Sequence, residues 1–187
     1  LEGLAPVGGL EDFFTWIDRV QPSELEPDYS RAEGFLAILR TTPAVLDHLS
    51  RQISPGGWTA RPQPNEWSLT EIICHLRDVD REVNIQRIQT VLDGSNPFIP
   101  GAVTDPWVKE RNYASECGSE ALIDFMNIRT EILHLLDSMD SGDWQKTARH
   151  AIFGPTHLKE LANFIATHDR AHIKQVWQTL QMVITET

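Results

Sequence analysis

Apolar side chains recur every three or four positions along four long segments of the chain, with polar residues between them. This spacing matches the period of an α-helix that buries one face, so each segment is expected to form an amphipathic helix. The short alternating runs and paired turn residues that indicate β-hairpins are nearly absent. The pattern predicts helices over about residues 29–53, from Ser68 to about Leu92, after Ser119 to about Asp140, and from Thr156 as N-cap through Val183.

Each predicted helix carries an apolar stripe that should face a common core. Ser68 and Glu71 fit the S-x-x-E capping box, and Trp67 and Ile72 are spaced for a hydrophobic staple around it. Pro43 lies inside the first helix and is expected to kink it. The four stripes comprise Phe35, Leu39, Leu46, Leu49 and Ile53; Ile72, His75, Leu76, Val79 and Val83; Leu122, Phe125, Met126, Arg129, Leu133 and Leu136; and Leu161, Ile165, His168, His172, Val176 and Val183.

Residues 93–118 join the second and third predicted helices and are rich in proline and glycine. They are too long for a simple turn, so they should form an ordered crossover on the surface. Residues 10–20 form another short amphipathic segment. The expected fold class is all-α: a four-helix bundle over residues 29–187, with a long crossover between helices 2 and 3 and an extra N-terminal helical segment in an extension over residues 1–28.

Histidines interrupt two of the four stripes. His168 and His172 are four positions apart, so their rings project from one face of the last helix, while His75 takes a leucine-like position in the second helix. A buried polar group without a partner costs about 1 to 3 kcal/mol. One shared divalent metal would satisfy a nitrogen of each ring, and three protein ligands leave a position open, as in catalytic zinc sites. Three separately hydrogen-bonded core histidines are the alternative.

Other polar residues are candidates for the same site. Arg129 lies in the stripe of the third helix, where it should meet an acid, a backbone carbonyl or an anionic substrate group, unless its guanidinium reaches solvent. His150 and His157 flank the "FGP" turn before the last helix and could line the mouth of a site. Arg129 and His150 are the predicted substrate-binding residues. Asp78 and Asp169 could accept hydrogen bonds from metal-bound imidazoles, or form salt bridges instead.

The composition limits the classes of partner. Sixteen basic and 27 acidic side chains give a formal net charge of −11, and the basic residues are scattered, so a nucleic acid would be repelled. No apolar run approaches the roughly 18 to 20 residues that span a bilayer, and no signal-peptide pattern is visible, which predicts a cytoplasmic protein without a membrane partner. Cys74 and Cys117 are far apart and in no metal-binding spacing, which fits a reducing compartment.

Four segments together resemble the DinB-like (DinB/YfiT) superfamily of metal-binding four-helix-bundle proteins. They are "NEWSLTEIICHLRDVDRE", "DPWVKERNYAS", "NIRTEIL" around Arg129, and "FGPTHLKELANFIATHDRAHIKQV", and they occur in the expected order. The resemblance implies that His75, His168 and His172 are the ligands of one divalent metal ion, usually zinc or nickel. It also implies a homodimer, which Trp16 and Trp107, outside the four stripes, would favour as interface aromatics.

The resemblance also suggests a chemistry. Studied branches of the superfamily include S-transferases that use bacillithiol or mycothiol and a thiol-dependent maleylpyruvate isomerase. We therefore expect a metal-dependent transferase that joins a low-molecular-weight thiol to a small electrophile, since a metal with a vacant position can lower the pKa of a bound thiol. Two alternatives stay open: a non-catalytic, stress-related metal-binding module, and a metal-dependent hydrolase, which would need an acid near the metal.

Overall fold

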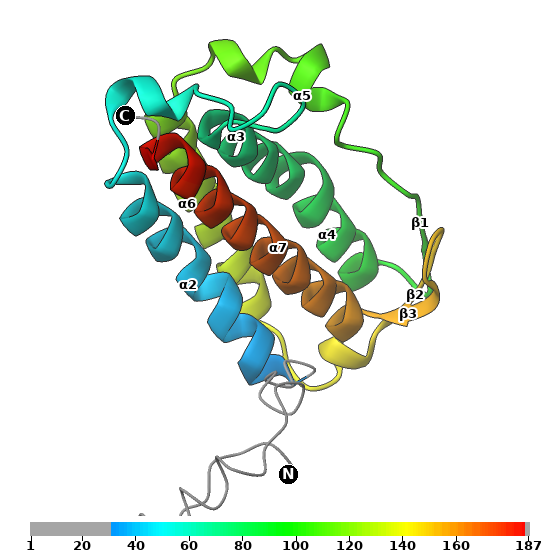
Figure 1. Ribbon diagram of the computed structural model, residues 1–187. Coiled ribbons are helices and arrows are strands. Elements are labelled where there is room, and N and C mark those ends of the chain that lie inside the picture. The colour runs from blue at the N-terminus through cyan, green and yellow to red at the C-terminus, as the bar shows by residue number, and fades with distance from the viewer. Residues whose placement is uncertain (1–30, 186–187) are drawn as a thin grey trace, which may run out of the picture.

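The computed structural model describes residues 31–185 and confirms an all-α bundle of four long helices (Figure 1). The first is α2 (Ala32–Ser50), and the second runs from α3 (Leu69–Val79) through a π-helical turn (Asp80–Asn84) into α4 (Ile85–Asp93). The third and fourth are α6 (Gly118–Asp137) and α7 (Leu158–Thr185). The predicted N-terminal segment at residues 10–20 and the boundary at residue 28 lie outside the described residues.

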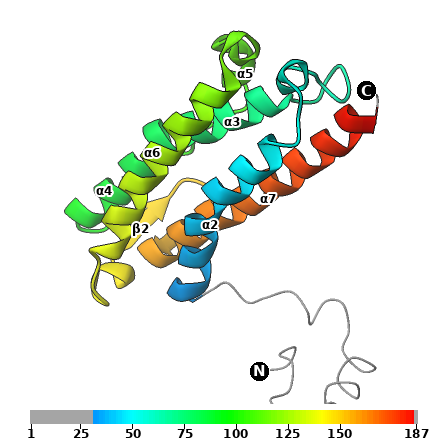
Figure 2. The ribbon, with the colours of Figure 1, turned by 90° about the vertical axis from the view of Figure 1, so that its left-hand side faces the viewer.

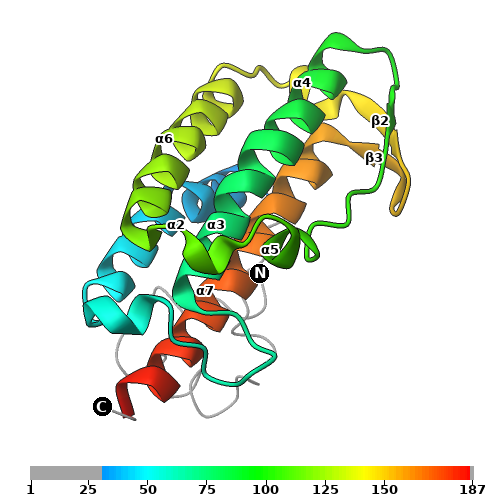
Figure 3. The ribbon, with the colours of Figure 1, turned by 90° about the horizontal axis from the view of Figure 1, so that it is seen from above.

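The direction of the helices explains the long crossover. α2 and α7 run one way along the bundle, and α3, α4 and α6 run the other way (Figures 1 and 2). Since α4 and α6 are parallel, the chain must return along the length of the molecule between them. Residues 94–117 make this return on the outside of the bundle, through the short helix α5 (Trp107–Glu110) (Figure 3). The predicted crossover is therefore confirmed.

The packing of the helices places the second helix next to the fourth. α2 packs against α6 and α7, and α3 packs against the same two helices, so α2 and α3 occupy opposite corners of the bundle.

Short 3₁₀ turns at Pro55–Trp58, Tyr113–Ser115 and Asp143–Gln145 join the longer elements. No helix within residues 31–185 combines the length and the apolar content needed to cross a lipid bilayer.

A small three-stranded sheet closes one end of the bundle, which the sequence pattern did not predict. β1 (Phe98–Ile99) pairs in parallel with β2 (Thr147–His150), and β2 pairs antiparallel with β3 (Gly154–His157). Gly154 has a φ of 71°, the left-handed conformation that glycine adopts without strain, at the end of the β2–β3 turn. Strands of two and four residues are too short to show a periodic pattern.

Two local predictions about helix starts had different outcomes. The capping box is present: the Glu71 N–H donates to Ser68 Oγ (3.3 Å), and the Ser68 N–H donates to Glu71 Oε2 (2.9 Å). The predicted N-cap of the last helix is wrong, because Thr156 lies in β3 and α7 begins at Leu158. There the Glu160 carboxylate accepts a 2.8 Å hydrogen bond from the His157 N–H, which satisfies one free donor at the helix start.

The buried face of α6 is rotated from the predicted stripe. Met126 is 37% exposed and Leu133 is only half-buried, whereas Ile128 and Ile132 are buried. The cause is tertiary, since α6 packs against both α2 and α3, and the positions of these two helices decide which side of α6 is buried.

A buried polar layer separates the apolar core into two clusters, one in each half of the bundle. At its centre Arg129 of α6 forms a two-pronged ion pair with Asp169 of α7, and its Nε donates to Asp80 Oδ2 in the π turn (2.8 Å). Its Nη1 donates to the Leu39 carbonyl of α2 (3.4 Å). α2 continues through Pro43, which has no N–H to offer that carbonyl, so the proline leaves an acceptor free for Arg129.

Candidate metal centre

The three histidines of the two predicted stripes meet between α3 and α7. His75 Nε2 lies 3.4 Å from His168 Nε2, and His172 Nε2 lies 3.0 Å from the same atom. One ligand atom from each ring falls within 4.8 Å of the others, and no fourth His, Cys, Asp or Glu of the described chain joins the group. In a tetrahedral zinc site, with Zn–N distances of about 2.0 to 2.1 Å, neighbouring nitrogens lie about 3.3 Å apart. The spacing of the rings therefore fits one shared ion.

The protonation of the rings also fits a metal. Burial, together with the neighbouring His172 and His168, lowers the pKa of His75 to about 3. Burial and His172 lower the pKa of His168 to about 4. Burial lowers the pKa of His172 as well, against opposing contributions from Gln175, Asp169 and Asp105. Neutral imidazoles present lone pairs, which is the form that binds a divalent cation.

The remaining ring nitrogens show how the ligands are oriented. His172 Nδ1 lies 2.8 Å from Gln175 Oε1, so its N–H donates to the amide oxygen and leaves the Nε2 lone pair facing the centre. His75 Nδ1 is buried with no hydrogen-bond partner. The indole of Trp67 packs against the same two rings, with centroids 5.0 Å from His75 and 6.2 Å from His172, and is nearly parallel to the latter. The residue before the capping box thus also covers the site.

The predicted supporting acids bind arginines instead of imidazoles. Asp169 pairs with Arg129, and Asp78 accepts from Arg77 Nε (2.7 Å) and Arg111 Nη1 (2.9 Å) and from the hydroxyl of Tyr113 (2.8 Å). The salt-bridge alternative is therefore the one that the structure shows, with both carboxylates buried. Asp169 still affects the site, because it follows His168 in α7 and opposes the fall of its pKa.

Arg129 points inward, as one of the two sequence interpretations held, but its guanidinium meets protein groups. The residue is 0% exposed, and its donors face Asp80, Asp169 and the Leu39 carbonyl. Burial alone would lower its pKa, yet the two carboxylates raise it above its ordinary value. This placement offers no contact to a substrate, so Arg129 acts in the structure as the partner that holds Asp169 beside His168.

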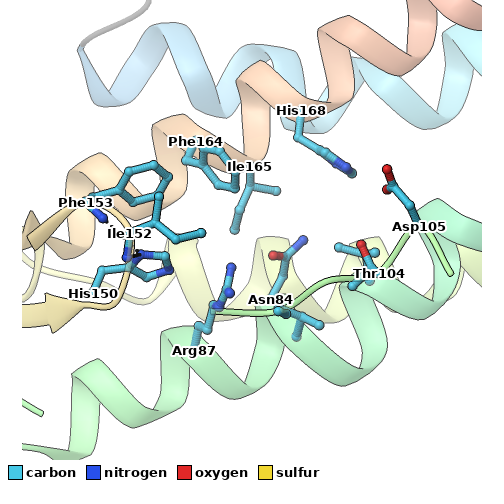
Figure 4. Close-up of a pocket in the computed structure, with 13 residues that line it drawn as sticks. Asn84, Arg87, Thr104, Asp105, His150, Ile152, Phe153, Phe164, Ile165 and His168 are labelled. Carbon is cyan, nitrogen blue, oxygen red and sulfur yellow. Dashed lines mark hydrogen bonds between the residues drawn. The ribbon is translucent and has the colours of Figure 1, made fainter. Parts of the chain in front are cut away.

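A cavity of about 180 Å³ extends from His168 toward the small sheet. Figure 4 shows His168 at one end with the carboxylate of Asp105 facing it, and His150 with Arg87 at the other end. His150, predicted to line a site, lines this cavity. His157 does not: it is exposed and pairs with Glu160.

The crossover brings Asp105 to the site. Arg111, six residues further on, binds both Asp78 and Glu82 on the second helix, and its guanidinium carbon lies 3.8 Å from the centroid of Trp107. These contacts fix the crossover against α3. The sequence did not identify Asp105 or Arg87 as residues of this site. The only sequence signal for Asp105 was the "DPW" string of the crossover, and no local pattern indicated Arg87.

A four-helix bundle whose second and fourth helices hold three converging histidines defines a class of metal-binding bundle proteins. The family model of the DinB superfamily matches residues 38–176, so the chain belongs to this superfamily.

Two similar proteins come from Bacillus subtilis. The chain is 21% identical over 128 residues to the uncharacterized protein YuaE of strain 168, covering 62% of this chain and 78% of YuaE. Its fold is similar to the solved structure of YfiT, described as a probable metal-dependent hydrolase with an unusual four-helix bundle topology. That match has a TM-score of 0.70 and 14% identity, and it covers 87% of this chain and 89% of YfiT.

Proposed function

We propose that this protein is a divalent-metal-dependent enzyme that transfers a low-molecular-weight thiol to a small electrophile. The observation that carries the proposal is the open three-histidine centre: His75, His168 and His172 converge, no fourth ligand of the described chain joins them, and His168 also borders a cavity. A metal that only stapled the bundle would be expected to have a closed set of four protein ligands. Zinc or nickel suits three imidazole nitrogens.

The chemistry divides between the ion and the chain. A divalent cation at the three imidazoles would lower the pKa of a thiol or water that takes its open position. The carboxylate of Asp105 faces His168 and accepts the proton that the thiol loses. The sulfur then forms a bond to the electrophilic carbon, and the leaving group departs with the bonding pair. Protein thiols do not compete, since burial raises the pKa of Cys74 to about 12 and Cys117 lies outside this cavity.

The remaining features support a small-molecule substrate. The net charge of −11 disfavours nucleic acid, and two free cysteines suit a reducing compartment such as the cytoplasm. A cavity of about 180 Å³ suits a substrate of a few heavy atoms beyond the reacting group.

Cobalt substitution tests the open position directly. We expect 2-mercaptoethanol and L-cysteine to change the d–d absorption of the cobalt-loaded protein and to add a sulfur-to-cobalt charge-transfer band. The matched alcohol, ethylene glycol, should not add that band. A spectrum that no thiol alters would show a closed structural site and would overturn the proposal.

Hydrolysis is the second candidate, favoured by the similarity to YfiT and by Asp105. An acid beside the metal is what a hydrolase needs as general base, and Asp105 is placed to serve. Two assays of the zinc-loaded protein distinguish the two functions. One measures alkylation of L-cysteine by monochlorobimane, and the other measures hydrolysis of 4-nitrophenyl acetate without a thiol. Turnover of the ester alone would favour the hydrolase, and thiol-dependent alkylation would favour the transferase.

A further inference from the structure

The far end of the cavity contains a hydrogen-bond donor without an acceptor. His150 ends β2, is 3% exposed, and stacks on Phe153 with ring centroids 4.5 Å apart. Its Nδ1 accepts from the N–H groups of Ile152 (3.2 Å) and Phe153 (3.4 Å), so the neutral ring carries its proton on Nε2. That Nε2 is buried and has no partner among residues 31–185. An N–H fixed in direction and unsatisfied is rare in a buried site and suggests an absent acceptor.

A cation without a carboxylate lies beside it. Arg87 of α4 is half-buried, and its Nη2 donates a hydrogen bond to the Pro100 carbonyl (3.1 Å). Within residues 31–185 no acid forms a salt bridge with it, and burial lowers its pKa. The positive charge of Arg87 in turn helps to lower the pKa of His150, which places the two groups in one electrostatic environment. A partly desolvated guanidinium is stabilised by a carboxylate, and the described part of the chain supplies none.

The π turn helps to bring Arg87 into the same cavity as the metal centre. Along an uninterrupted α-helix, a residue twelve positions after His75 would lie about 120° around the axis from it. The wider turn at Asp80–Asn84 rotates the chain less per residue and moves Arg87 toward the face of His75. Between His168 and the Arg87–His150 pair, Ile152, Phe164 and Ile165 form an apolar wall of the cavity, and the opposite wall includes the polar side chains of Asn84 and Thr104 (Figure 4).

We propose that Arg87 and His150 together bind the carboxylate of a small molecule whose apolar body lies along the cavity toward His168. The placement of the reacting end at the metal centre rests on the proposed function, whereas the placement of the carboxylate at Arg87 and His150 does not. The bidentate face of a guanidinium and one imidazole N–H match the two oxygens of a carboxylate. A phosphate dianion carries a second negative charge, which the net charge of −11 on the chain disfavours.

The test measures binding of hexanoate against hexanamide, which has the same chain and no charge. Isothermal titration would use the zinc-loaded protein and the variants Arg87→Met, Arg87→Lys, His150→Leu and His150→Gln, each checked for helix content by circular dichroism. Arg149→Met is the matched control, because Arg149 precedes His150 in β2 but is exposed and does not line the cavity. Titration of His168→Ala shows whether hexanoate binds the metal instead of the arginine.

We expect the parent protein and Arg149→Met to bind hexanoate about ten-fold or more tighter than hexanamide, as charged hydrogen bonds imply. Arg87→Met and His150→Leu should lose this preference, whereas Arg87→Lys and His150→Gln, which keep a donor, should retain part of it. His168→Ala should keep it in full. Equal binding of the two probes by the parent, a preference that survives in Arg87→Met, or one that disappears in His168→Ala would overturn the proposal.

A second arm separates this inference from the proposed function. The cobalt-loaded protein is titrated with 4-mercaptobutanoate and with 1-propanethiol, which lacks the carboxylate. If neither thiol alters the spectrum while the hexanoate preference persists, the metal chemistry is wrong and the carboxylate site stands. If both thiols bind the cobalt protein equally well, the carboxylate site is wrong and the open metal position stands.

Discussion

At the scale of single residues, the three candidate ligand histidines are defined by what surrounds them. Each ring is largely buried, each has a lowered pKa, and the Nε2 atoms face one another at 3.0 and 3.4 Å. Ring nitrogens buried at this spacing need a shared proton or cation, and a divalent ion would satisfy one nitrogen of each ring at once. The packing of α3 against α7 is what brings the three rings together.

Removal of one ligand should remove the metal. His168→Ala is expected to abolish stoichiometric binding of zinc, because two imidazoles leave the ion with too few protein ligands. Metal content by plasma emission spectrometry after gel filtration measures this. The control is His134→Ala, since His134 is exposed on α6 and outside the group. One tightly held metal per chain in the His168 variant would show that the ligand assignment is wrong.

The lowered pKa values predict how the metal-free protein responds to acid. The folded rings stay neutral down to about pH 3 to 4, whereas unfolded histidine binds a proton near pH 6.5. The unfolded state therefore binds more protons as the pH falls below 6.5, so the free energy of unfolding decreases, by up to about 2 kcal/mol per buried ring at pH 5. Urea unfolding of chelator-treated protein at pH 7 and pH 5 measures the effect. His75→Leu should reduce this pH dependence, and a dependence unchanged from the parent would contradict the prediction.

The buried ion pairs of Arg129 make a substitution there costly. Arg129→Met leaves Asp80 and Asp169 buried without a cation, so we expect a loss of about 3 to 5 kcal/mol in the free energy of unfolding, measured in urea. Adding Asp80→Asn and Asp169→Asn should restore part of it, since neutral amides need no counter-charge. An Arg129→Met protein as stable as the parent would show that the polar layer contributes nothing to stability.

At the scale of elements, the crossover and the second helix act as one unit. Asp78 of α3 accepts from Tyr113 and Arg111 of the crossover, and Arg111 also reaches Glu82. This network holds the crossover where Asp105, two residues before α5, faces His168 (Figure 4). The position of Asp105, the candidate proton acceptor, thus depends on Asp78, whose carboxylate pairs with none of the three imidazoles.

Asp78→Ala should loosen the crossover without removing the metal ligands. The buried Tyr113 hydroxyl and Arg77 Nε and the partly exposed Arg111 lose an acceptor, which costs about 1 to 3 kcal/mol for each buried donor that stays unsatisfied. Hydrogen exchange followed by mass spectrometry should show faster exchange in residues 100–115, while zinc content stays at one per chain. Asp124→Ala is the control, because its side chain is 54% exposed on α6. Unchanged exchange across the crossover would mean that other contacts hold it in place.

At the scale of the whole molecule, the bundle buries two apolar clusters and a polar layer, and it leaves some large apolar side chains on the outside. Trp107 is not the exposed aromatic that the sequence suggested, since it packs against the core and under Arg111. Trp177 of α7, 48% exposed, is a better candidate for an interface.

The formation of a homodimer by this protein is still a prediction. Light scattering coupled to gel filtration should give twice the 21.2 kDa mass of the chain at micromolar concentration, and Trp177→Lys should shift it toward the monomer if α7 lies in the interface. A parent mass of one chain across the concentration range would contradict the dimer.

The sequence by itself determined the features that depend on near neighbours in the chain. The four helices, the capping box at Ser68 and the pairing of His168 with His172 all rest on contacts within about four residues, which a helical period makes visible. His75 could be added because an imidazole in an apolar stripe needs a partner. The need of these histidines for a partner was thus predictable, whereas the inward direction of Arg129 was one of two interpretations that the sequence left open.

Only the tertiary structure decided which partners these groups find. Arg129 meets Asp80 and Asp169, 49 and 40 residues away, and no local pattern favours those acids over others. The same holds for Asp105 beside His168 and for Arg87 beside His150, which a crossover, a short sheet and a π turn bring together. Contacts of this kind depend on how whole helices pack and rotate, and the free energy of that packing is spread over the entire core.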